Sequence, residues 1–186
     1  MAEAKVYNET EHKMRSSLEA LQRELAGIRT GRAAPHLLDG ITVEAYGQLM
    51  PLNQLATINV PDSRMLIVQP WDLNNLAVIE RAILKANIGV TPANDGKIIR
   101  CPIPPLTEER RKELAKFVHR FGEDAKVALR NIRHHANDIT KKMRKDGELG
   151  EDEEHRNLDR IQELTDQYVE RIDKICEEKE KELMEG

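Results

Sequence analysis

The chain has 186 residues, enough for one large domain or two small ones, and 33% of them are charged against 39% hydrophobic. This balance favours long amphipathic helices over a thick globular core. The six aromatic residues are too few for a base-stacking platform of the kind that binds single-stranded RNA. The net charge of -4, taken alone, argues against a nucleic-acid partner.

Compartment and membrane association can be predicted from simple features of the sequence. No stretch approaches the ~18 apolar residues that a membrane helix needs, and the first residues lack the apolar region of a secretory signal. Cys101 and Cys176 form no CxxC pair, and Cys101 is expected to be a small buried apolar residue. We therefore expect a cytoplasmic protein that does not contact membranes.

Apolar residues recur every three or four positions near the N-terminus, which predicts a helix that buries one stripe. We expect this helix to stop at residues 30–31, because glycine tolerates the left-handed backbone that is common just past a helix end. The expected stripe consists of Tyr7, Met14, Leu18, Leu21, Leu25 and Ile28.

Residues 30–105 have the pattern of a small α/β domain. A helix is expected over residues 73–87, with Asp72 as a candidate N-cap. Trp71 is expected to be a packing anchor, with a partner contact as the alternative. Strands are expected at 41–46, 55–60, 65–68 and 97–101, with turns at 47–48 and 91–96.

Two long helices are predicted in the second half of the chain. The first follows the proline-rich residues 102–105, takes Thr107 as its N-cap and runs to about Lys145. A short turn over residues 146–150 leads to the other, which begins near Glu151 with acids in its first turn. The apolar stripes are Leu114, Val118, Phe121, Ala125, Ala128, Ile132 and Ile139 in the first, and Leu158, Ile161, Tyr168, Ile172, Ile175 and Leu183 in the second.

Each stripe is too narrow to be buried alone, so we expect the three long helices to form an elongated antiparallel bundle. The predicted class is α+β: residues 1–29 and 106–186 form the bundle, and residues 30–105 form an inserted β/α/β domain. Two connections then cross between the domains and predict a hinge, although a fixed interface is the alternative. The hinge residues are Thr30, Gly31, Arg32, Pro104 and Pro105.

The net charge hides a strong polarity along the chain. Residues 105–145 carry twelve Lys or Arg against six Asp or Glu, whereas residues 146–186 carry six against sixteen. The local charges are therefore +6 and -10. Because the local field decides whether a surface attracts phosphate, the average charge does not exclude an RNA partner.

One face of the first long C-terminal helix is basic. On a helical wheel its members fall within about 80°, roughly 135° from the apolar stripe. The face extends over about 48 Å, which suits a nucleic-acid backbone better than a small ligand. Its arginines can each form two hydrogen bonds to a phosphate. This basic face consists of Lys112, His119, Lys126, Arg130, Arg133, Asn137, Lys141 and Arg144.

The alternative for this face is a set of solvated cations paired with acids of the last helix, and exposed pairs of that kind contribute little. The basic face has no carboxylate of its own between Lys126 and Arg144, which favours phosphate binding. We therefore predict RNA contacts for Arg133, Arg130, Lys126, Asn137, Lys141, Arg144 and Lys112.

No pattern in the sequence predicts catalysis, a metal site or a cofactor. His134, His135 and His155 are not at metal-ligand spacing with cysteines or acids, and the acidic run 151–154 is typical of a helix start. Walker loops, GxGxxG, HExxH and the nucleophile elbow are absent from the sequence.

Five motifs together resemble the ribosome recycling factor family over essentially the whole chain: IRTGRA at 28–33, LLDGI at 37–41, PPLTEERRK at 104–112, RNIR at 130–133 and KELM at 181–184. The resemblance implies an L-shaped molecule that is not an enzyme. It implies binding to the large ribosomal subunit after termination, and splitting of the post-termination complex with elongation factor G and its GTP hydrolysis. By motif, Arg133 is the main rRNA contact, with Arg130 beside it; His134 and His135 follow where the family carries a more basic pair.

The hypothesis from the sequence is thus a monomeric, non-enzymatic wedge: the basic face docks on rRNA, and the inserted domain moves about the hinge when the GTPase pushes. The alternative function is a helical protein-interaction adaptor that uses the acidic last helix.

Overall fold

The computed structural model describes residues 2–185, which divide into two compact units. The helical unit contains residues 2–29 and 108–185, and the α/β unit contains residues 30–107. The expected class, a helical bundle together with a small β-containing domain, is confirmed.

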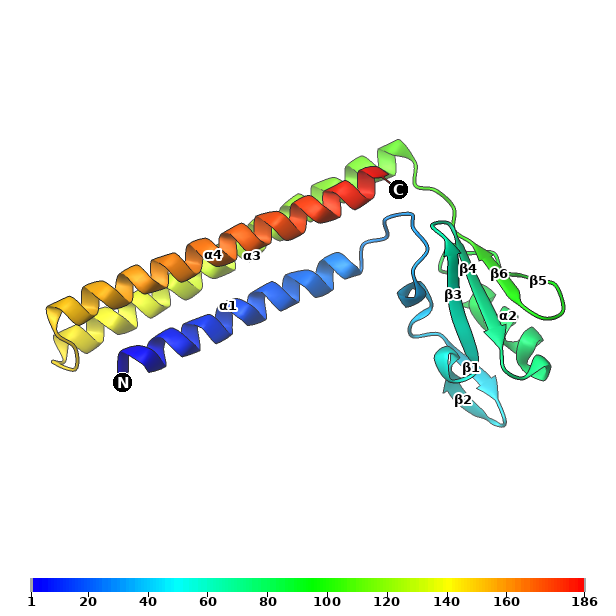
Figure 1. Ribbon diagram of the computed structural model, residues 1–186, viewed down its shortest axis with the longest axis horizontal. Helices are drawn as coiled ribbons and strands as arrows, with labels where there is room; N and C mark the ends of the chain where they lie inside the picture. The colour runs from blue at the N-terminus through cyan, green and yellow to red at the C-terminus, as the bar shows by residue number, and fades with distance from the viewer. Residues whose placement is uncertain (1, 186) are drawn as a thin grey trace. The chain divides into compact units, whose positions relative to one another are not determined.

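Three long helices lie side by side in the helical unit (Figure 1): α1 (Ala2–Ala26), α3 (Glu108–Lys145) and α4 (Glu151–Glu185). Helix α3 runs antiparallel to the other two. Gly147, with a φ of 79°, lies in the turn that joins α3 to α4. The boundaries predicted for α3 and for the start of α4 are confirmed, because prolines precede α3 and glycines lie in the turn between the two helices.

Helix α1 ends earlier than the sequence predicted. Its last residue is Ala26, and the N–H groups of Gly27 and Ile28 close the final turn on the carbonyls of Arg23 and Leu25, at 3.3 and 3.1 Å. The expected stop at residues 30–31 is therefore wrong by four positions. Gly27, a poor helix former, ends the helix before Gly31 is reached.

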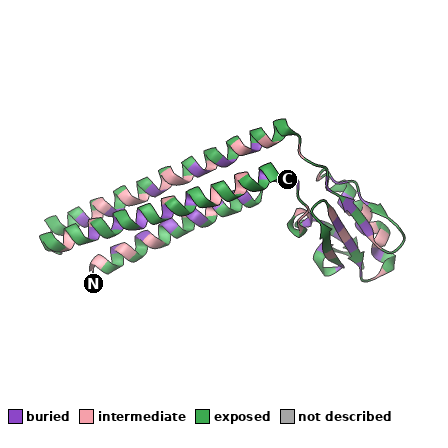
Figure 2. Ribbon diagram, turned by 45° about the horizontal axis from the view of Figure 1, so that its top comes forward, coloured by how far each residue is buried: buried purple, intermediate pink, exposed green. Residues whose placement is uncertain are grey.

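Buried residues recur at intervals along each helix of the bundle, seen as purple segments in Figure 2. In α1 the predicted stripe is corrected at its two ends: Val6 and Thr10 are buried, whereas Tyr7 and Ile28 are only half-buried. Tyr7 instead packs its ring beneath the Arg160 guanidinium, 4.2 Å from the ring centroid.

The centre of the α3 stripe also differs from the prediction. Half-buried positions are Phe121, Ala125, Ala128, Ile132 and Ile139, and the fully buried line passes through Leu114, Val118, Gly122, Leu129, Ala136 and Thr140. In α4, Leu158 and Ile175 are half-buried, and the buried residues are Asn157, Ile161, Leu164, Thr165, Tyr168, Ile172 and Leu183. The stripes are rotated because polar and small residues, which the hydrophobic pattern leaves out, are part of the core.

The buried threonines of the bundle form hydrogen bonds within their own helices, whereas Asn157 reaches across to α3 and leaves its Oδ1 without a partner among the described residues. The hydroxyls of Thr10, Thr140 and Thr165 donate to backbone carbonyls four residues earlier, at 2.7 to 2.9 Å. The Asn157 amide of α4 donates to Thr140 Oγ1 of α3 at 2.8 Å. This bond fixes the axial register of α3 against α4, as buried polar contacts do in coiled coils.

The α/β unit begins with a short 3-10 helix (η1, Pro35–Leu38) and a hairpin of β1 (Thr42–Ala45) and β2 (Gln48–Pro51). Tyr46 and Gly47 form the turn, with φ values of 53° and 76°, as a two-residue hairpin requires. The predicted turn at 47–48 is therefore wrong by one residue, and Gln48 belongs to a strand that was not predicted.

A four-stranded antiparallel sheet in the order β3-β4-β6-β5 forms the rest of the unit. Its strands are β3 (Ala56–Asp62), β4 (Met65–Pro70), β5 (Ala93–Asn94) and β6 (Ile99–Pro102); a 3-10 turn, η2 (Leu52–Gln54), precedes them. Strand β5 lies within the predicted turn 91–96.

The helical part of this unit is shorter than predicted. Helix α2 covers Leu76–Lys85, and the preceding Leu73–Asn75 form a 3-10 turn, η3. Asp72 caps η3 by accepting the Asn74 N–H at 3.0 Å. That bond, followed by one from the Tyr46 hydroxyl, lowers the pKa of the Asp72 carboxyl.

A single apolar cluster fills the space between α2 and the strands of the α/β unit. Cys101 is fully buried in it, as predicted, and burial raises the pKa of its thiol to about 11. The packing role predicted for Trp71 is wrong: its side chain is 66% exposed, and its indole N–H donates to Thr57 Oγ1 at 2.8 Å.

Candidate nucleic-acid interface

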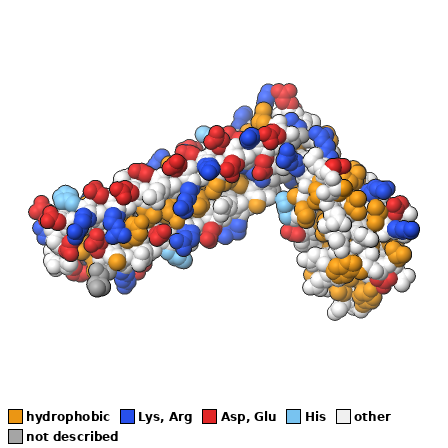
Figure 3. All heavy atoms as spheres, in the orientation of Figure 1, with side chains coloured by type: hydrophobic (Ala, Val, Ile, Leu, Met, Phe, Trp, Pro, Cys, Tyr) orange, Lys and Arg blue, Asp and Glu red, His pale blue; other side chains and the backbone are white. Residues whose placement is uncertain are grey.

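Charged side chains of both signs crowd the face of the helical unit visible in Figure 3, whereas exposed apolar groups are prominent on the α/β unit. The basic face occupies α3, an uninterrupted helix of 38 residues that holds its members in a fixed row. The structure separates this row into a seam edge toward α4 (Lys126, Arg133, Arg144) and an outer edge (Arg130, Lys141), according to the partners of each side chain.

Lys126, on the seam edge, is largely enclosed, with 18% of its side chain exposed. Its ammonium pairs with Asp173 of α4 and, at 3.5 Å, with Glu123 of its own helix. The hydrogen bond to Asp173 raises the pKa of Lys126, against a smaller opposing effect of burial. Its positive charge is thus offset by two carboxylates.

The other two cations of the seam edge also reach α4. Arg144 Nε lies 3.7 Å from Glu154 Oε2, and Arg133 Nη1 donates to Gln162 Oε1 at 3.4 Å. Arg133 is half-buried, and its partner is an uncharged amide rather than a carboxylate.

The outer edge is different. Arg130 and Lys141 are both exposed, and among residues 2–185 no carboxylate lies within ion-pair distance of either. These cations face water with their charges uncompensated. They are therefore ready to receive phosphate oxygens without first breaking an existing ion pair.

The remaining members of the basic face have individual environments. Lys112 pairs with Glu108 one turn away at 3.2 Å, and both side chains are well exposed, so this pair is weak. Asn137 is half-buried, and its Oδ1 is buried without a hydrogen-bond partner among the described residues. His119 is exposed.

The residues predicted as a hinge lie at both ends of the α/β unit. Gly31 is buried with a φ of 77°, and a β-carbon added to it would meet Leu106 Cγ at 3.2 Å. The first and last segments of the α/β unit therefore touch at this point. The other predicted hinge residues are Thr30, which is half-buried, and Arg32, Pro104 and Pro105, which are exposed.

The α4 residues that hold the seam edge were not predicted as site residues. Gln162, Asp173 and Glu154 lie on the neighbouring helix, so the pattern of α3 alone does not point to them. The short turn between the helices could have identified these partners. It makes α3 and α4 an antiparallel hairpin, in which the residue numbers of two facing residues add up to a nearly constant value.

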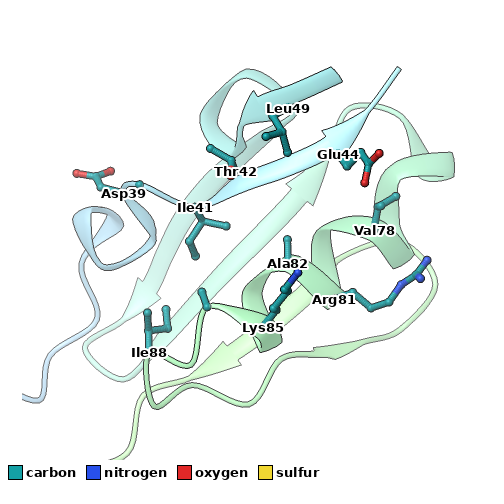
Figure 4. Close-up of a pocket in the computed structure, with 12 residues that line it drawn as sticks. Asp39, Ile41, Thr42, Glu44, Leu49, Val78, Arg81, Ala82, Lys85 and Ile88 are labelled. Carbon is teal, nitrogen blue, oxygen red and sulfur yellow. The ribbon is translucent and has the colours of Figure 1, made fainter. Parts of the chain in front are cut away.

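A groove of about 700 Å³ lies in the α/β unit between β1 and α2 (Figure 4). Its rim carries Arg81 and Lys85 from α2, opposed by the carboxylates of Asp39 and Glu44. The two signs offset each other, so the groove has no preference for an anion. Elsewhere in residues 2–185, no group of three His, Cys, Asp or Glu is placed to hold a metal, and none of the helices has an apolar stretch of the length that a membrane crossing requires.

Comparison with known proteins gives a consistent result. Residues 21–184 match the family described as Ribosome recycling factor. The chain is 58% identical to the ribosome-recycling factor of Bacillus licheniformis and 53% identical to that of Bacillus subtilis, in each case over 97% of both chains.

Solved structures agree with the sequence relatives. A solution structure of ribosome recycling factor superposes with a TM-score of 0.78 at 39% identity, covering 100% of this chain and 99% of the other. The T. thermophilus factor, from models of it and E. coli elongation factor G bound to the E. coli post-termination complex, gives a TM-score of 0.65 at 47% identity, covering 98% and 99%. The chain therefore belongs to the ribosome recycling factor family, a family of non-enzymatic translation factors.

Proposed function

We propose that this protein recycles ribosomes: it binds rRNA of the large subunit after termination through the basic face of α3, and it splits the post-termination complex together with elongation factor G and GTP. The translocase supplies the free energy, and this protein supplies position and leverage. It acts as a monomer in the cytoplasm. The support is membership of the family and a relative whose structure was placed on a post-termination complex with that GTPase.

The observation that carries the RNA contact is the uncompensated charge at the centre of the basic face. Arg130 and Arg133 are adjacent on α3, and neither has a carboxylate partner among residues 2–185. Arginine presents five N–H donors in a planar fork that fits phosphate oxygens, and phosphate contacts dominate affinity for folded RNA. The scarcity of aromatic residues also favours recognition of RNA backbone and shape over base stacking.

The direct test is binding to purified large ribosomal subunits in a pelleting assay at low salt. Arg133→Ala should weaken binding about tenfold, because it removes one charge-assisted hydrogen bond to phosphate, and Arg130→Ala should weaken it somewhat less. Arg156→Ala is the matched control, since it removes an exposed arginine of α4 that does not belong to the basic face. Unchanged affinity for Arg133→Ala would exclude the RNA contact, and sensitivity to Glu151 reversal instead would favour the adaptor function.

The hinge is the second part of the proposal. Gly31 has a positive φ and lies against Leu106, so a side chain there would strain the backbone and wedge apart the two connecting segments. Gly31→Ala should reduce the rate of ribosome splitting more than it reduces subunit binding. Gly40→Ala is the control, because Gly40 has a φ of 79° but open space around its missing side chain. Equal splitting rates for the two variants would argue against a hinge at Gly31.

A further inference from the structure

The seam between α3 and α4 holds three cations of the basic face, and one of its three cross-helix partners differs in kind. Lys126 faces Asp173, and Arg144 faces Glu154 at 3.7 Å, so both cations meet carboxylates. Arg133, between them along α3, meets the side-chain amide of Gln162 at 3.4 Å. The position with the neutral partner is thus the one whose arginine stands at the centre of the proposed rRNA contact.

A neutral partner has a specific consequence for Arg133. A carboxylate at this position would neutralise the guanidinium and compete directly with phosphate for its N–H groups. An amide oxygen accepts one of the five N–H donors and leaves the full positive charge in place. Arg133 is half-buried, and four of its five N–H donors remain for an incoming anion.

Asp166, one turn further along α4, fixes the orientation of this amide. Gln162 Nε2 donates to Asp166 Oδ1 at 2.9 Å. An ionised carboxylate can only accept hydrogen bonds, so it draws the NH₂ group of Gln162 to itself and turns the amide oxygen toward Arg133. The chain from Asp166 through Gln162 to Arg133 therefore has one consistent direction of donors and acceptors.

We propose that Gln162 is a positioning residue that orients Arg133 for an RNA phosphate without neutralising its charge. The ordering of a long side chain before binding reduces the conformational entropy lost in the complex. This inference rests on the proposed function, in which Arg133 contacts rRNA.

The experiment compares Gln162→Glu with Gln167→Glu, each in the wild-type background and in the Arg133→Ala background, by binding to large subunits over a range of salt concentrations. Gln167 is exposed on the same helix, so the two substitutions change the net charge equally. Gln162→Glu should weaken binding about fivefold. It should also make the dependence of affinity on salt shallower, by the amount expected for the loss of one phosphate contact. Gln167→Glu should change affinity less than about twofold. Gln162→Ala, which adds no charge, should weaken binding about twofold because Arg133 is no longer oriented.

The Arg133→Ala background distinguishes failure of the positioning role of Gln162 from failure of the proposed function. If Gln162 acts through Arg133, Gln162→Glu should have no further effect once Arg133 is absent. An equal effect in both backgrounds would show direct repulsion of RNA and overturn the positioning role. If Arg133→Ala weakens binding but Gln162→Glu behaves like Gln167→Glu, the inference fails and the proposed function stands. If Arg133→Ala itself has no effect, the proposed function fails and the inference fails with it. Far-UV circular dichroism at the assay temperature confirms that all variants compared are folded.

Discussion

The seam edge and the outer edge of the basic face carry similar cations in different surroundings. Lys126 and Arg144, on the seam edge, are tied to carboxylates of α4, whereas Arg130 and Lys141, on the outer edge, have uncompensated charges. A paired cation must give up its partner before it can bind a phosphate, and an unpaired one exchanges only water. The neighbouring helix therefore divides the basic residues of α3 into cations that are paired with carboxylates, Lys126 and Arg144, and cations that are not, which include Arg133 of the seam edge.

The largest expected effect comes from removing the outer edge. The double variant Arg130→Ala/Lys141→Ala should bind large subunits about thirtyfold more weakly, which corresponds to about 1 kcal/mol for each phosphate interaction removed. The matched seam variant Lys126→Ala/Arg144→Ala removes the same charge and should bind about threefold more weakly at most. Pelleting at constant salt measures both. Equal reductions would mean that only the total charge of α3 matters and that the two edges do not differ.

Helices α3 and α4 pack closely where a glycine of α3 faces a cysteine of α4. Gly122 of α3 is buried, and a β-carbon at this position would lie 2.7 Å from Cys176 Sγ of α4. Gly122→Ala should therefore force the helices apart and reduce the free energy of unfolding by about 1–2 kcal/mol. In a Cys176→Ala background the clash is removed, because the next nearest atom, the Cys176 β-carbon, is at 3.8 Å. There the substitution should be nearly neutral or stabilising, since alanine favours the helix.

Chemical denaturation of the four proteins in this cycle measures the coupling between the two positions. Destabilisation of the same size in both backgrounds would show that Gly122 is not in tight contact with α4.

A smaller effect is expected for the stability of single charge variants. Lys126→Ala should reduce the free energy of unfolding by about 0.5–1 kcal/mol, because it removes a mostly enclosed side chain whose ammonium pairs with two carboxylates. Arg130→Ala should change it by less than about 0.5 kcal/mol, because this side chain has no carboxylate partner among residues 2–185. Thermal or urea unfolding followed by circular dichroism checks both values. A greater destabilisation by Arg130→Ala than by Lys126→Ala would reverse the assignment of the two edges.

The long elements of the fold could be predicted because residues that stop helices mark their ends in the sequence. Prolines before Glu108 and the Asp146–Gly147 pair set the ends of α3 within a residue or two. Short-range turn chemistry was less predictable: in the β1–β2 hairpin, Tyr46 adopts a positive φ that is rare for an aromatic residue, so the sequence pattern predicts the turn one residue too late.

The bundle core was predicted only in outline. Thr10, Thr140 and Asn157 are polar, so a hydrophobic pattern leaves them out of the core. They are nevertheless buried, because they form hydrogen bonds within the helix or across to a neighbouring helix. Trp71 was wrongly expected in the core because its size favours burial, whereas its ring lies on the surface of the α/β unit.

The candidate site shows the same division between local and tertiary information. The row of cations on α3 follows from residue spacing on one helix. Which of them are neutralised depends on the facing residues of α4, and the amide of Gln162 opposite Arg133 is evident only from the packed helices.

The salt dependence of binding tests the central claim most directly, because each cation that binds a phosphate releases counterions. The logarithm of the affinity for large subunits should fall linearly with the logarithm of salt concentration. The Arg130→Ala/Lys141→Ala variant should show a slope that is shallower by roughly 1.5, or about 0.7–0.9 for each phosphate that is no longer neutralised. The seam variant Lys126→Ala/Arg144→Ala should keep a slope close to that of the wild type. A wild-type slope near zero, or one unchanged in the outer-edge variant, would contradict the assignment of the basic face as a phosphate-binding surface.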